Sequence, residues 1–267
     1  GAYFGHLAML PTPLAAAPPV VGATSPAAGA AGVAPSSAVT VAFSEPMDTA
    51  ATQAAFSLRA PDGSPVAGSF AWAGTTLTFR PAAPLREATS YTATITTEAR
   101  DAAGNPLAAA RSWTFRTQAT VAASPFAAAI TAGTLRAGDA NRLRADDNAY
   151  FQVNSTRSGT RAADLYGRFR GVSNGLRSLR VAYRGKSSAV CSQTVALYNW
   201  RTRAWAPLDT RMVGTTEVPL DRTVAGSLTD YVSGTTGDGE VRLRVRCTGP
   251  TSFYASADLM RITFTRP

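Results

Sequence analysis

Apolar and polar positions in the first half of the chain form short segments separated by turn residues. Residues 38–43 show the alternation of a half-buried strand, and residues 69–79 form two such segments around Gly74, which is typical of a hairpin. No segment between residues 20 and 117 keeps a helical period. We therefore predict an immunoglobulin-like sandwich without a disulfide bond. Its predicted strands are 38–43, 56–58, 69–72, 75–79, 91–96 and 112–115.

Beyond residue 125 arginine and aromatic residues become more frequent, and strand-like segments again dominate. These segments lie at 149–153, 164–170, 176–183, 191–200, 205–208, 216–220, 240–247 and 259–264. So many strands in this length, closed by a C-terminal strand, favour a jelly-roll sandwich. The predicted fold class is all-β, with tandem β-sandwiches: an Ig-like domain followed by a jelly-roll domain.

A chain of 267 residues has room for two domains of ordinary size. We predict an N-terminal apolar segment and Pro/Ala linker at 1–19, an Ig-like domain at 20–117, a linker at 118–124 and a jelly-roll binding domain at 125–267. The opening segment lacks a basic region and a starting Met, so we interpret it as the end of an upstream part of a longer secreted protein. No run of 18 apolar residues predicts a transmembrane segment.

The first domain carries a specific combination of motifs. These are Ser25-Pro26, the segment Val39–Asp48 (VTVAFSEPMD), Thr76–Pro81 (TLTFRP), Asp101–Leu107 (DAAGNPL) and Trp113–Phe115 (WTF). In this order they resemble the bacterial Ig-like domain family named after an S-layer protein. The resemblance covers residues 20–117 and implies a spacer or adhesive module of secreted and surface proteins. It brings no catalytic residues with it.

The second domain has a less specific resemblance over residues 133–265. The segments that carry it are 146–153 (DDNAYFQV), 179–185 (LRVAYRG), 196–200 (ALYNW), 205–208 (WAPL) and 256–264 (SADLMRITF). They are similar to jelly-roll modules at the C-termini of secreted actinobacterial proteins, which share their plan with carbohydrate-binding modules. The resemblance implies ligand binding or surface attachment, and no motif fixes the ligand.

Composition excludes several classes of site. The single histidine, His6, lies in the N-terminal segment, so the predicted domains contain no Ser-His-Asp triad and no multi-histidine zinc site. Two cysteines are too few for a thiolate zinc or iron–sulfur site. The formal charge of +9 belongs to the second half, because residues 1–123 hold six arginines and six acidic residues. Such a basic domain favours polyanionic partners such as acidic cell-envelope polymers.

The two cysteines of the second domain are both predicted to face its core. Strand alternation places Cys191 on the side of Val195 and Leu197, and Cys247 on the side of Leu243 and Val245. In a secreted sandwich this predicts a Cys191–Cys247 disulfide, which would stabilise the fold by about 4 kcal/mol on the chain-entropy estimate. Two buried free thiols are the alternative.

The same alternation places Arg242, Arg244 and Arg246 in a row on the opposite face of their strand. Like charges in a row repel one another, so local stability does not require them. A polyanion would offset the repulsion, since guanidinium groups suit carboxylate, sulfate or phosphate. The alternative is a solvated face on which these arginines pair with acids of neighbouring strands.

Aromatic residues suggest a second binding surface. Residues 198–205 (YNWRTRAW) predict two strands joined by a short arginine-bearing turn, with Tyr198 and Trp200 on one face and Trp205 on the returning strand. Sugar rings stack on such side chains, so Tyr198, Trp200 and Trp205 are candidate ligand-binding residues. A cross-strand aromatic pair that only packs the hairpin is the alternative.

A structural calcium site is the third candidate. Asp146 and Asp147 lie on an early segment and Asp258 on the closing strand, and these two regions are often neighbours in jelly rolls. Converging carboxylates would suit an oxygen-ligand cation. Ordinary turn chemistry for residues 146–148 is the alternative, and the same interpretation holds for Glu45, Asp48 and Asp101 in the first domain. No cofactor is required by the sequence.

Catalysis and sequence-specific nucleic-acid binding find no support. Paired carboxylates can hydrolyse glycosides without histidine, but Asp164, Asp209, Glu217 and Asp230 have no spacing or motif that makes them a catalytic pair. We therefore expect no enzyme. No reading helix or recognition motif is present, so the basic charge would support only non-specific contacts with nucleic-acid backbones.

These observations favour a non-catalytic extracellular or cell-surface attachment region. In it, the Ig-like spacer presents a basic module that binds polysaccharide or another cell-envelope polymer. The alternative is a structural subunit of a surface layer or extracellular fibre, which assembles through protein contacts that include the N-terminal segment.

Overall fold

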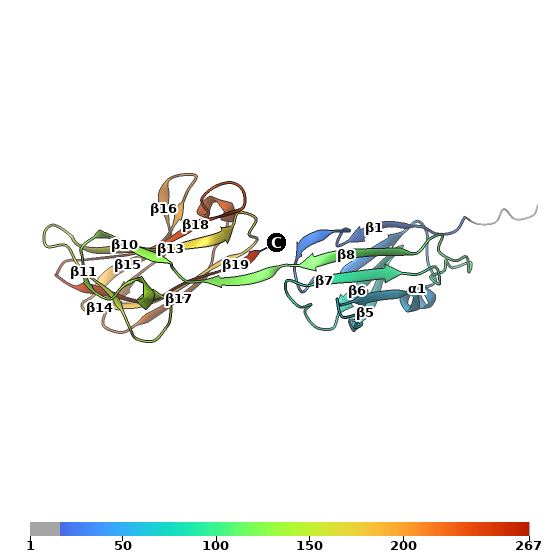
Figure 1. Cartoon of the computed structure of the whole chain (residues 1–267), viewed down its shortest axis with the longest axis horizontal. Helices are drawn as coiled ribbons and strands as arrows, with labels where there is room; N and C mark the ends of the chain where they lie inside the picture. Colours follow the sequence, from blue (N-terminus) through green and yellow to red (C-terminus); the bar gives the residue numbers. More distant parts are fainter. Residues whose placement is uncertain (1–16, 267) are drawn as a thin grey trace, which may run out of the picture. The chain divides into compact units, whose positions relative to one another are not determined.

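Strands make up most of the structure, as the alternating pattern predicts. The computed structural model describes residues 17–266, and these divide into two units at the junction of Thr117 and Gln118. The fold class is all-β, with each unit built from facing sheets (Figure 1). Residues 1–16, and with them most of the predicted N-terminal segment and its proposed protein contacts, lie outside the described residues.

The first unit contains two four-stranded sheets around one core. One sheet has the order β1 (Val21–Ser25), β3 (Val39–Phe43), β6 (Thr76–Pro81) and β5 (Gly68–Ala73). The other has the order β2 (Ala30–Val33), β8 (Arg111–Thr117), β7 (Ser90–Ile95) and β4 (Phe56–Arg59). The alternation of β3 buries Val39, Val41 and Phe43 against the opposite sheet, where Trp113 and Phe115 of β8 are also buried.

One helix interrupts this unit, α1 (Thr49–Ala55), which the sequence pattern does not predict. Its seven residues are too few to show a helical period. Asp48, interpreted above as part of a turn, is its N-cap and accepts a hydrogen bond from the backbone N–H of Ala51 at 2.9 Å. Asp101 does close a turn, since its carboxylate accepts from the backbone N–H groups of Ala103 and Asn105.

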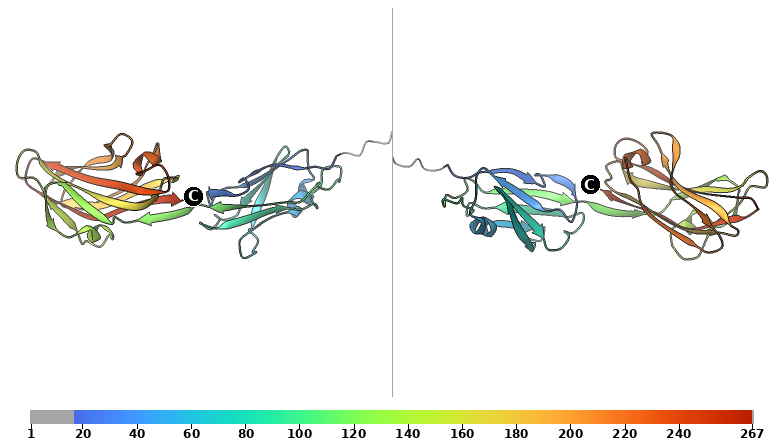
Figure 2. Two further views of the ribbon diagram at one scale, coloured as in Figure 1. Left: turned by 45° about the horizontal axis from the view of Figure 1, so that its top comes forward. Right: turned by 180° about the vertical axis from the view of Figure 1, so that it is seen from behind.

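The second unit is a sandwich of antiparallel sheets, seen from two further sides in Figure 2. The five-stranded sheet has the order β10 (Ala127–Ala132), β13 (Arg161–Ser173), β18 (Asp238–Gly249), β15 (Cys191–Asn199) and β16 (Ala204–Val213). The six-stranded sheet has the order β11 (Thr134–Ala137), β12 (Phe151–Asn154), β19 (Tyr254–Arg266), β14 (Leu179–Ser187) and β17 (Val218–Thr223), and β9 (Ala119–Ala123) also pairs with β19. Two short 3₁₀ helices, η1 (Ala140–Leu143) and η2 (Leu228–Tyr231), complete the unit.

The segment predicted as a linker, 118–124, is therefore largely a strand. Residues of β9 pair in register with the C-terminal strand β19, from Ala123 opposite Ile262 to Ala119 opposite Arg266. The small residues of this segment show no apolar alternation strong enough to predict a strand. Its partner strand lies almost 150 residues away in the sequence, so no local hairpin pattern reveals the pairing either.

Alternation along the central strand β18 builds the core of the second unit. Val241, Leu243 and Val245 are at most 1% exposed and pack with residues of the facing sheet such as Val181 and Ile262. Since β18 lies between β13 and β15, its inward side chains are surrounded on both flanks.

Among residues 17–266, no helix has the length and apolar character of a bilayer span.

The predicted disulfide is not formed: Cys191 and Cys247 are buried free thiols. The prediction that both face the core is correct, but the register of β15 and β18 sets Cys247 opposite Gln193. Cys191 is therefore a diagonal neighbour of Cys247, two residues away from the directly opposed position. The hydrogen bond with Cys191, together with burial, raises the pKa of the Cys247 thiol.

Core packing on β18 predicts a large effect when one of its inward side chains is truncated. Leu243→Ala should lower the free energy of unfolding by about 2–5 kcal/mol, because a fully buried side chain is lost and leaves a cavity. Leu135→Ala, on a side chain that is 55% exposed, should change it by less than about 0.5 kcal/mol. Denaturant unfolding curves of the full chain give both values, and equal effects would contradict this core.

Thiol chemistry tests the corrected cysteine assignment. Without reductant, iodoacetamide should modify neither cysteine in the folded chain, because both are buried, and should modify both after denaturation. Intact mass spectrometry counts the added groups. A denatured chain that takes up none would show that the two sulfurs are bonded after all.

Candidate functional site

Strand β18 presents the predicted arginine row on the outward face of the five-stranded sheet. Arg242, Arg244 and Arg246 alternate with the buried residues of the same strand, so the predicted division of the two faces is correct. The arginines do not stand alone. Strand β13 places Asp164, Tyr166 and Arg168 opposite Arg246, Arg244 and Arg242, respectively.

Two carboxylates hold four guanidinium groups on this face. Asp164 accepts from both Nε and Nη2 of Arg244 and lies 3.9 Å from Nε of Arg246. Glu240 lies 2.6 Å from Arg168 through one oxygen and 2.6 Å from Arg242 through the other. Arg168 and Arg242 are directly opposite each other, so Glu240 relieves the repulsion of two like charges.

The pairing leaves the face positively charged. Four guanidinium groups against two carboxylates give a net charge of +2. Burial opposes ionisation of Glu240, but the hydrogen bonds from Arg168 and Arg242 outweigh it and lower the pKa of this carboxyl. The alternative in which the arginines pair with acids of neighbouring strands is thus correct for Arg244, whose partner Asp164 lies on β13. The partner of Arg242, Glu240, lies on β18 itself. Arg246 has a loose contact only, and its side chain is 49% exposed.

The aromatic candidates belong to the same surface. The guanidinium of Arg242 lies 4.5 Å from the ring centre of Trp200 and 5.6 Å from that of Tyr198, and the guanidinium of Arg244 lies 5.2 Å from that of Trp205. Tyr198 contacts both tryptophans edge-on, at 5.0 and 5.2 Å between ring centres. The two sites that the sequence suggests separately are therefore one surface.

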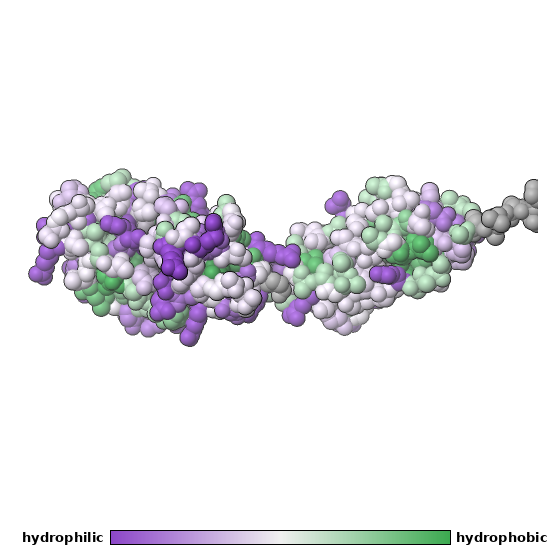
Figure 3. Space-filling model, turned by 90° about the horizontal axis from the view of Figure 1, so that it is seen from above, coloured by the Kyte–Doolittle hydropathy of each residue, from purple (hydrophilic) through white to green (hydrophobic). Residues whose placement is uncertain are grey.

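We call this surface the arginine–aromatic face. It consists of Asp164, Tyr166, Arg168, Tyr198, Trp200, Trp205, Glu240, Arg242, Arg244 and Arg246. Figure 3 views the molecule from the side on which β16 lies in Figure 1, and strongly hydrophilic residues gather there on the second unit.

A groove of about 790 Å³ adjoins the arginine–aromatic face at the end of β15. Tyr198 and Trp200 form part of its wall, with Arg201 and Arg203 of the following turn. Trp200 is fixed there by two hydrogen bonds, from its backbone N–H to the carbonyl of Asp230 at 2.7 Å and from Nε1 to the carbonyl of Glu240 at 3.0 Å. The groove thus has an aromatic wall, in which Trp200 is held by two hydrogen bonds, and it is also lined by two long cationic side chains.

Several residues of this surface were not singled out from the sequence. Tyr166, Arg168 and Glu240 lie on it, and Asp164 was considered only as a catalytic carboxylate. Their signal was the alternation of residues 164–168, which places three polar or amphipathic side chains on one side of β13. That signal identifies a face, but the partner strand is needed to show that this face carries the arginine row.

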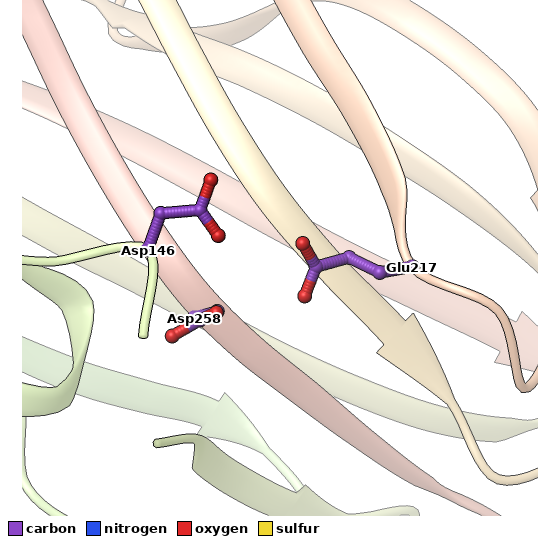
Figure 4. A group of neighbouring side chains, drawn as sticks. All are labelled: Asp146, Glu217 and Asp258. Carbon is purple, nitrogen blue, oxygen red and sulfur yellow. The ribbon is translucent and has the colours of Figure 1, made fainter. Parts of the chain in front are cut away.

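Acidic side chains gather at a different place, on the six-stranded sheet. Carboxylate oxygens of Asp146, Glu217 and Asp258 lie within 4.8 Å of one another, and Figure 4 shows the three groups turned toward a common centre. Asp146 precedes β12, Glu217 precedes β17, and Asp258 lies on β19, where it is fully buried. Of the predicted set, Asp146 and Asp258 are brought together, as expected.

Asp147 is not a member of this carboxylate cluster. Its carboxylate accepts from the backbone N–H of Ala149 at 3.0 Å, which is the turn chemistry considered for this segment. Glu217 takes the third position instead. Backbone N–H groups of Asp147 and Asn148 donate to Asp258, at 3.4 and 2.9 Å, and so hold the 146–148 turn against β19.

Burial and mutual repulsion shift the pKa of two of the three carboxyl groups. Burial, then the charges of Asp258 and Asp146, raise the pKa of Glu217. Burial also raises the pKa of Asp258, with a further contribution from Asp146 that the two backbone N–H groups partly offset. The donor set is oxygen only, which is what a hard cation such as Ca²⁺ prefers.

The other carboxylates considered for catalysis have arginine partners. Asp164 is bound to Arg244, Asp209 accepts from Arg211 and Arg222, and Asp230 accepts from Arg201 at 2.9 Å. The hydrogen bond from Arg211, against the opposing effect of burial, lowers the pKa of Asp209.

Comparison with known protein families gives a match over the first unit. Residues 15–117 match the family model of the bacterial Ig-like domain. This agrees with the motifs and the two facing sheets of that unit. A search of curated proteins finds no match.

Solved structures with local likeness come from several classes. An L,D-transpeptidase from Mycobacterium smegmatis is 25% identical over 38% of this chain and 40% of its own length, with a TM-score of 0.28. The N-terminal part of the bacterial S-layer protein SbsC is 15% identical over 58% of this chain and 41% of its own, at 0.30. TmCBM61, solved in complex with β-1,4-galactotriose, is 9% identical over 54% and 86%, at 0.28. The chain thus spans about two fifths of the first two proteins.

The buried ion pair of the arginine–aromatic face yields a stability prediction. Asp164→Asn should lower the free energy of unfolding by about 3 kcal/mol, because the guanidinium of Arg244 is only 17% exposed and loses its counter-charge. Asp238→Asn breaks the exposed pair with Arg266 and should cost less than about 1 kcal/mol. Denaturant unfolding of both variants measures the difference, and similar small losses would show that Asp164 does not anchor the face.

Proposed function

We propose that the second unit binds a polysaccharide or another cell-envelope polymer across the arginine–aromatic face and its adjoining groove. The observation that carries the proposal is the convergence on one surface of four aromatic rings and four guanidinium groups with a net charge of +2. Aromatic faces and edges suit sugar rings, and guanidinium groups suit the acidic groups of an envelope polymer.

The internal pairing favours recognition over simple attraction. Asp164 and Glu240 fix Arg244, Arg168 and Arg242 before a ligand arrives, so little side-chain entropy is lost on binding. Arg246 is the member with spare hydrogen-bonding capacity, since it is half-exposed and lies 3.9 Å from Asp164. We expect Arg246, which lies opposite Thr194 on β15, to meet an acidic group of the polymer. Tyr198, four residues further along β15, and the adjoining Trp200 would position other sugar rings of the same polymer.

The first unit supports this role as a spacer. As a bacterial Ig-like domain with a charge-balanced sequence, it would present the second unit at the cell surface or outside the cell. The role requires no reaction, and we propose a non-catalytic attachment region. We also propose that the second unit is a sandwich of the jelly-roll type, as its sequence predicts.

A cation in the carboxylate cluster is the second part of the proposal. Three carboxylates within 4.8 Å repel one another, and a bound Ca²⁺ would relieve the strain that raises the pKa of Glu217 and Asp258. The cation would fasten the 146–148 turn to β19 and the start of β17. Its role here would be structural.

Affinity electrophoresis of the full chain tests the binding proposal. Polygalacturonate in the gel should retard the protein, and the effect should weaken as salt rises from 50 to 200 mM, on the scale of about tenfold, because the charges involved are exposed. Arg246→Ser should weaken binding about tenfold, the equivalent of one charge-assisted hydrogen bond. Tyr198→Ala should weaken it further by removing the groove wall.

Arg157→Ser is the matched control, since Arg157 is an exposed loop arginine of the same unit. It should bind as the unmodified chain does. Wild-type retardation by Arg246→Ser and Tyr198→Ala would refute the proposed face. Concentration-dependent self-association without polymer binding would favour the alternative, a subunit of a surface layer or fibre.

Calcium addition tests the carboxylate cluster. In excess chelator, Glu217→Gln should make the chain more stable at neutral pH, because a group with a raised native pKa costs stability while it is ionised. With Ca²⁺ at 100 times its Kd, the unmodified chain should gain about 2.7 kcal/mol and the variant much less. Asp147→Asn, outside the cluster, should keep the gain. Thermal unfolding with and without Ca²⁺ measures these changes, and no gain in the unmodified chain would exclude the site.

A further inference from the structure

The outward face of the six-stranded sheet carries a hollow of its own, about 330 Å³ in volume. It lies on the opposite side of the sandwich from the arginine–aromatic face, on strands β14, β17 and β19. Neither the arginine row nor the aromatic residues contribute to it. Its lining residues are Asp146, Arg180, Ala182, Arg184, Asp221, Leu259, Arg261 and Thr263.

Strand register explains why the surface is hollow there. Ala182 on β14 lies directly between Asp221 on β17 and Arg261 on β19. Arg180 and Arg184 flank it at two residues' distance on the same face of β14. A methyl group thus forms the floor, and four long or charged side chains rise around it.

Two of the three arginines are already oriented. Asp221 lies 3.5 Å from Arg180 and 3.4 Å from Arg184. Arg184 is fixed further, because its Nη1 donates to the carbonyls of Tyr183 and Leu220 and its Nε lies 3.6 Å from Asp146. Its side chain is consequently only 21% exposed.

Arg261 differs from the other two. It is exposed, and its side chain has neither an ion pair nor a hydrogen bond among residues 17–266. Three guanidinium groups face two carboxylates around the hollow, which leaves one positive charge without a counter-charge. The unpaired charge sits at the wall across from Asp221, where a ligand over Ala182 would meet it.

We propose that this hollow is a second binding site of the unit, for a sugar-sized group that carries an oxyanion, either a carboxylate or a phosphate. The fork of a guanidinium matches both oxyanions, and the volume is at the lower end of small-ligand sites. Arg261 binds the oxyanion, Arg180 and Arg184 add positive charge from the rim, and Asp221 accepts from ligand hydroxyl groups.

Two sites on opposite faces have a consequence for attachment. A polymer strand on one face leaves the other face free, so one unit can hold two strands or two segments of a network. Binding of a polymer at both sites raises the overall avidity above that of either site alone.

Small sugars test the site without involving long polymers. Galacturonate, glucose 1-phosphate and galactose are titrated into the full chain, and two-dimensional NMR follows the arginine Nε–H signals. The two charged sugars should shift the Arg261 signal, and galactose should bind at least tenfold more weakly. The tighter of the two charged sugars identifies the oxyanion as carboxylate or phosphate.

Three variants decide the location. Arg261→Ser and Ala182→Leu, the second of which fills the hollow without changing its charge, should each weaken binding of the charged sugars at least tenfold. Arg157→Ser, on an exposed loop outside both sites, should leave it unchanged. Wild-type affinity in Arg261→Ser, or equal binding of galactose, would overturn the proposal. Circular dichroism checks folding, and Arg261→Ser, an exposed position, decides alone if Ala182→Leu does not fold.

Discussion

Two carboxylates, Asp164 and Glu240, organise the outward face of the second unit. The five-stranded sheet brings Arg168 on β13 directly opposite Arg242 on β18, an arrangement that like charges would otherwise disfavour. Glu240 bridges these two, and Asp164 binds Arg244 and approaches Arg246. The side chain of Asp164 is 3% exposed and that of Arg244 is 17% exposed, so loss of Asp164 would leave a largely buried charge without its partner.

The same strand that carries this network also builds the core. Along β18 each arginine is preceded by a buried aliphatic residue, so the position of the arginines is as fixed as the packing beneath them. The aromatic rings of Tyr198, Trp200 and Trp205 then take their places around Arg242 and Arg244. A binding surface built on central strands in this way is more rigid than one built on loops.

Sequence patterns predicted the all-β class, most strands, the two faces of β18 and the convergence of Asp146 with Asp258. These depend on the period of two along a strand, which is local. What failed depends on register between distant strands. Cys191 and Cys247 are diagonal, Glu217 replaces Asp147 in the carboxylate cluster, and residues 119–123 pair with the last strand. In each case the contact depends on how segments far apart in the sequence pair or meet, and a single sequence does not contain that information.

Composition predicts the net charge of the second half but not which of its arginines are paired with acidic residues. The second half does hold more arginines than acidic residues, but the acidic side chains are distributed unevenly among the arginines. Asp164 and Glu240 hold four arginines, whereas three other acids share one cluster and Arg261 has no partner among the described residues. This uneven pairing, more than the total of +9, distinguishes the faces on which anionic ligands are expected to bind.

A crystal structure of the full chain with an acidic oligosaccharide would test the central claim most directly. We expect sugar rings along Tyr198 and Trp200, an acidic group within hydrogen-bond distance of Arg246, and ion pairs of Asp164 and Glu240 unchanged from the free protein. An oligosaccharide bound elsewhere on the second unit, with Arg246 still solvated, would contradict it.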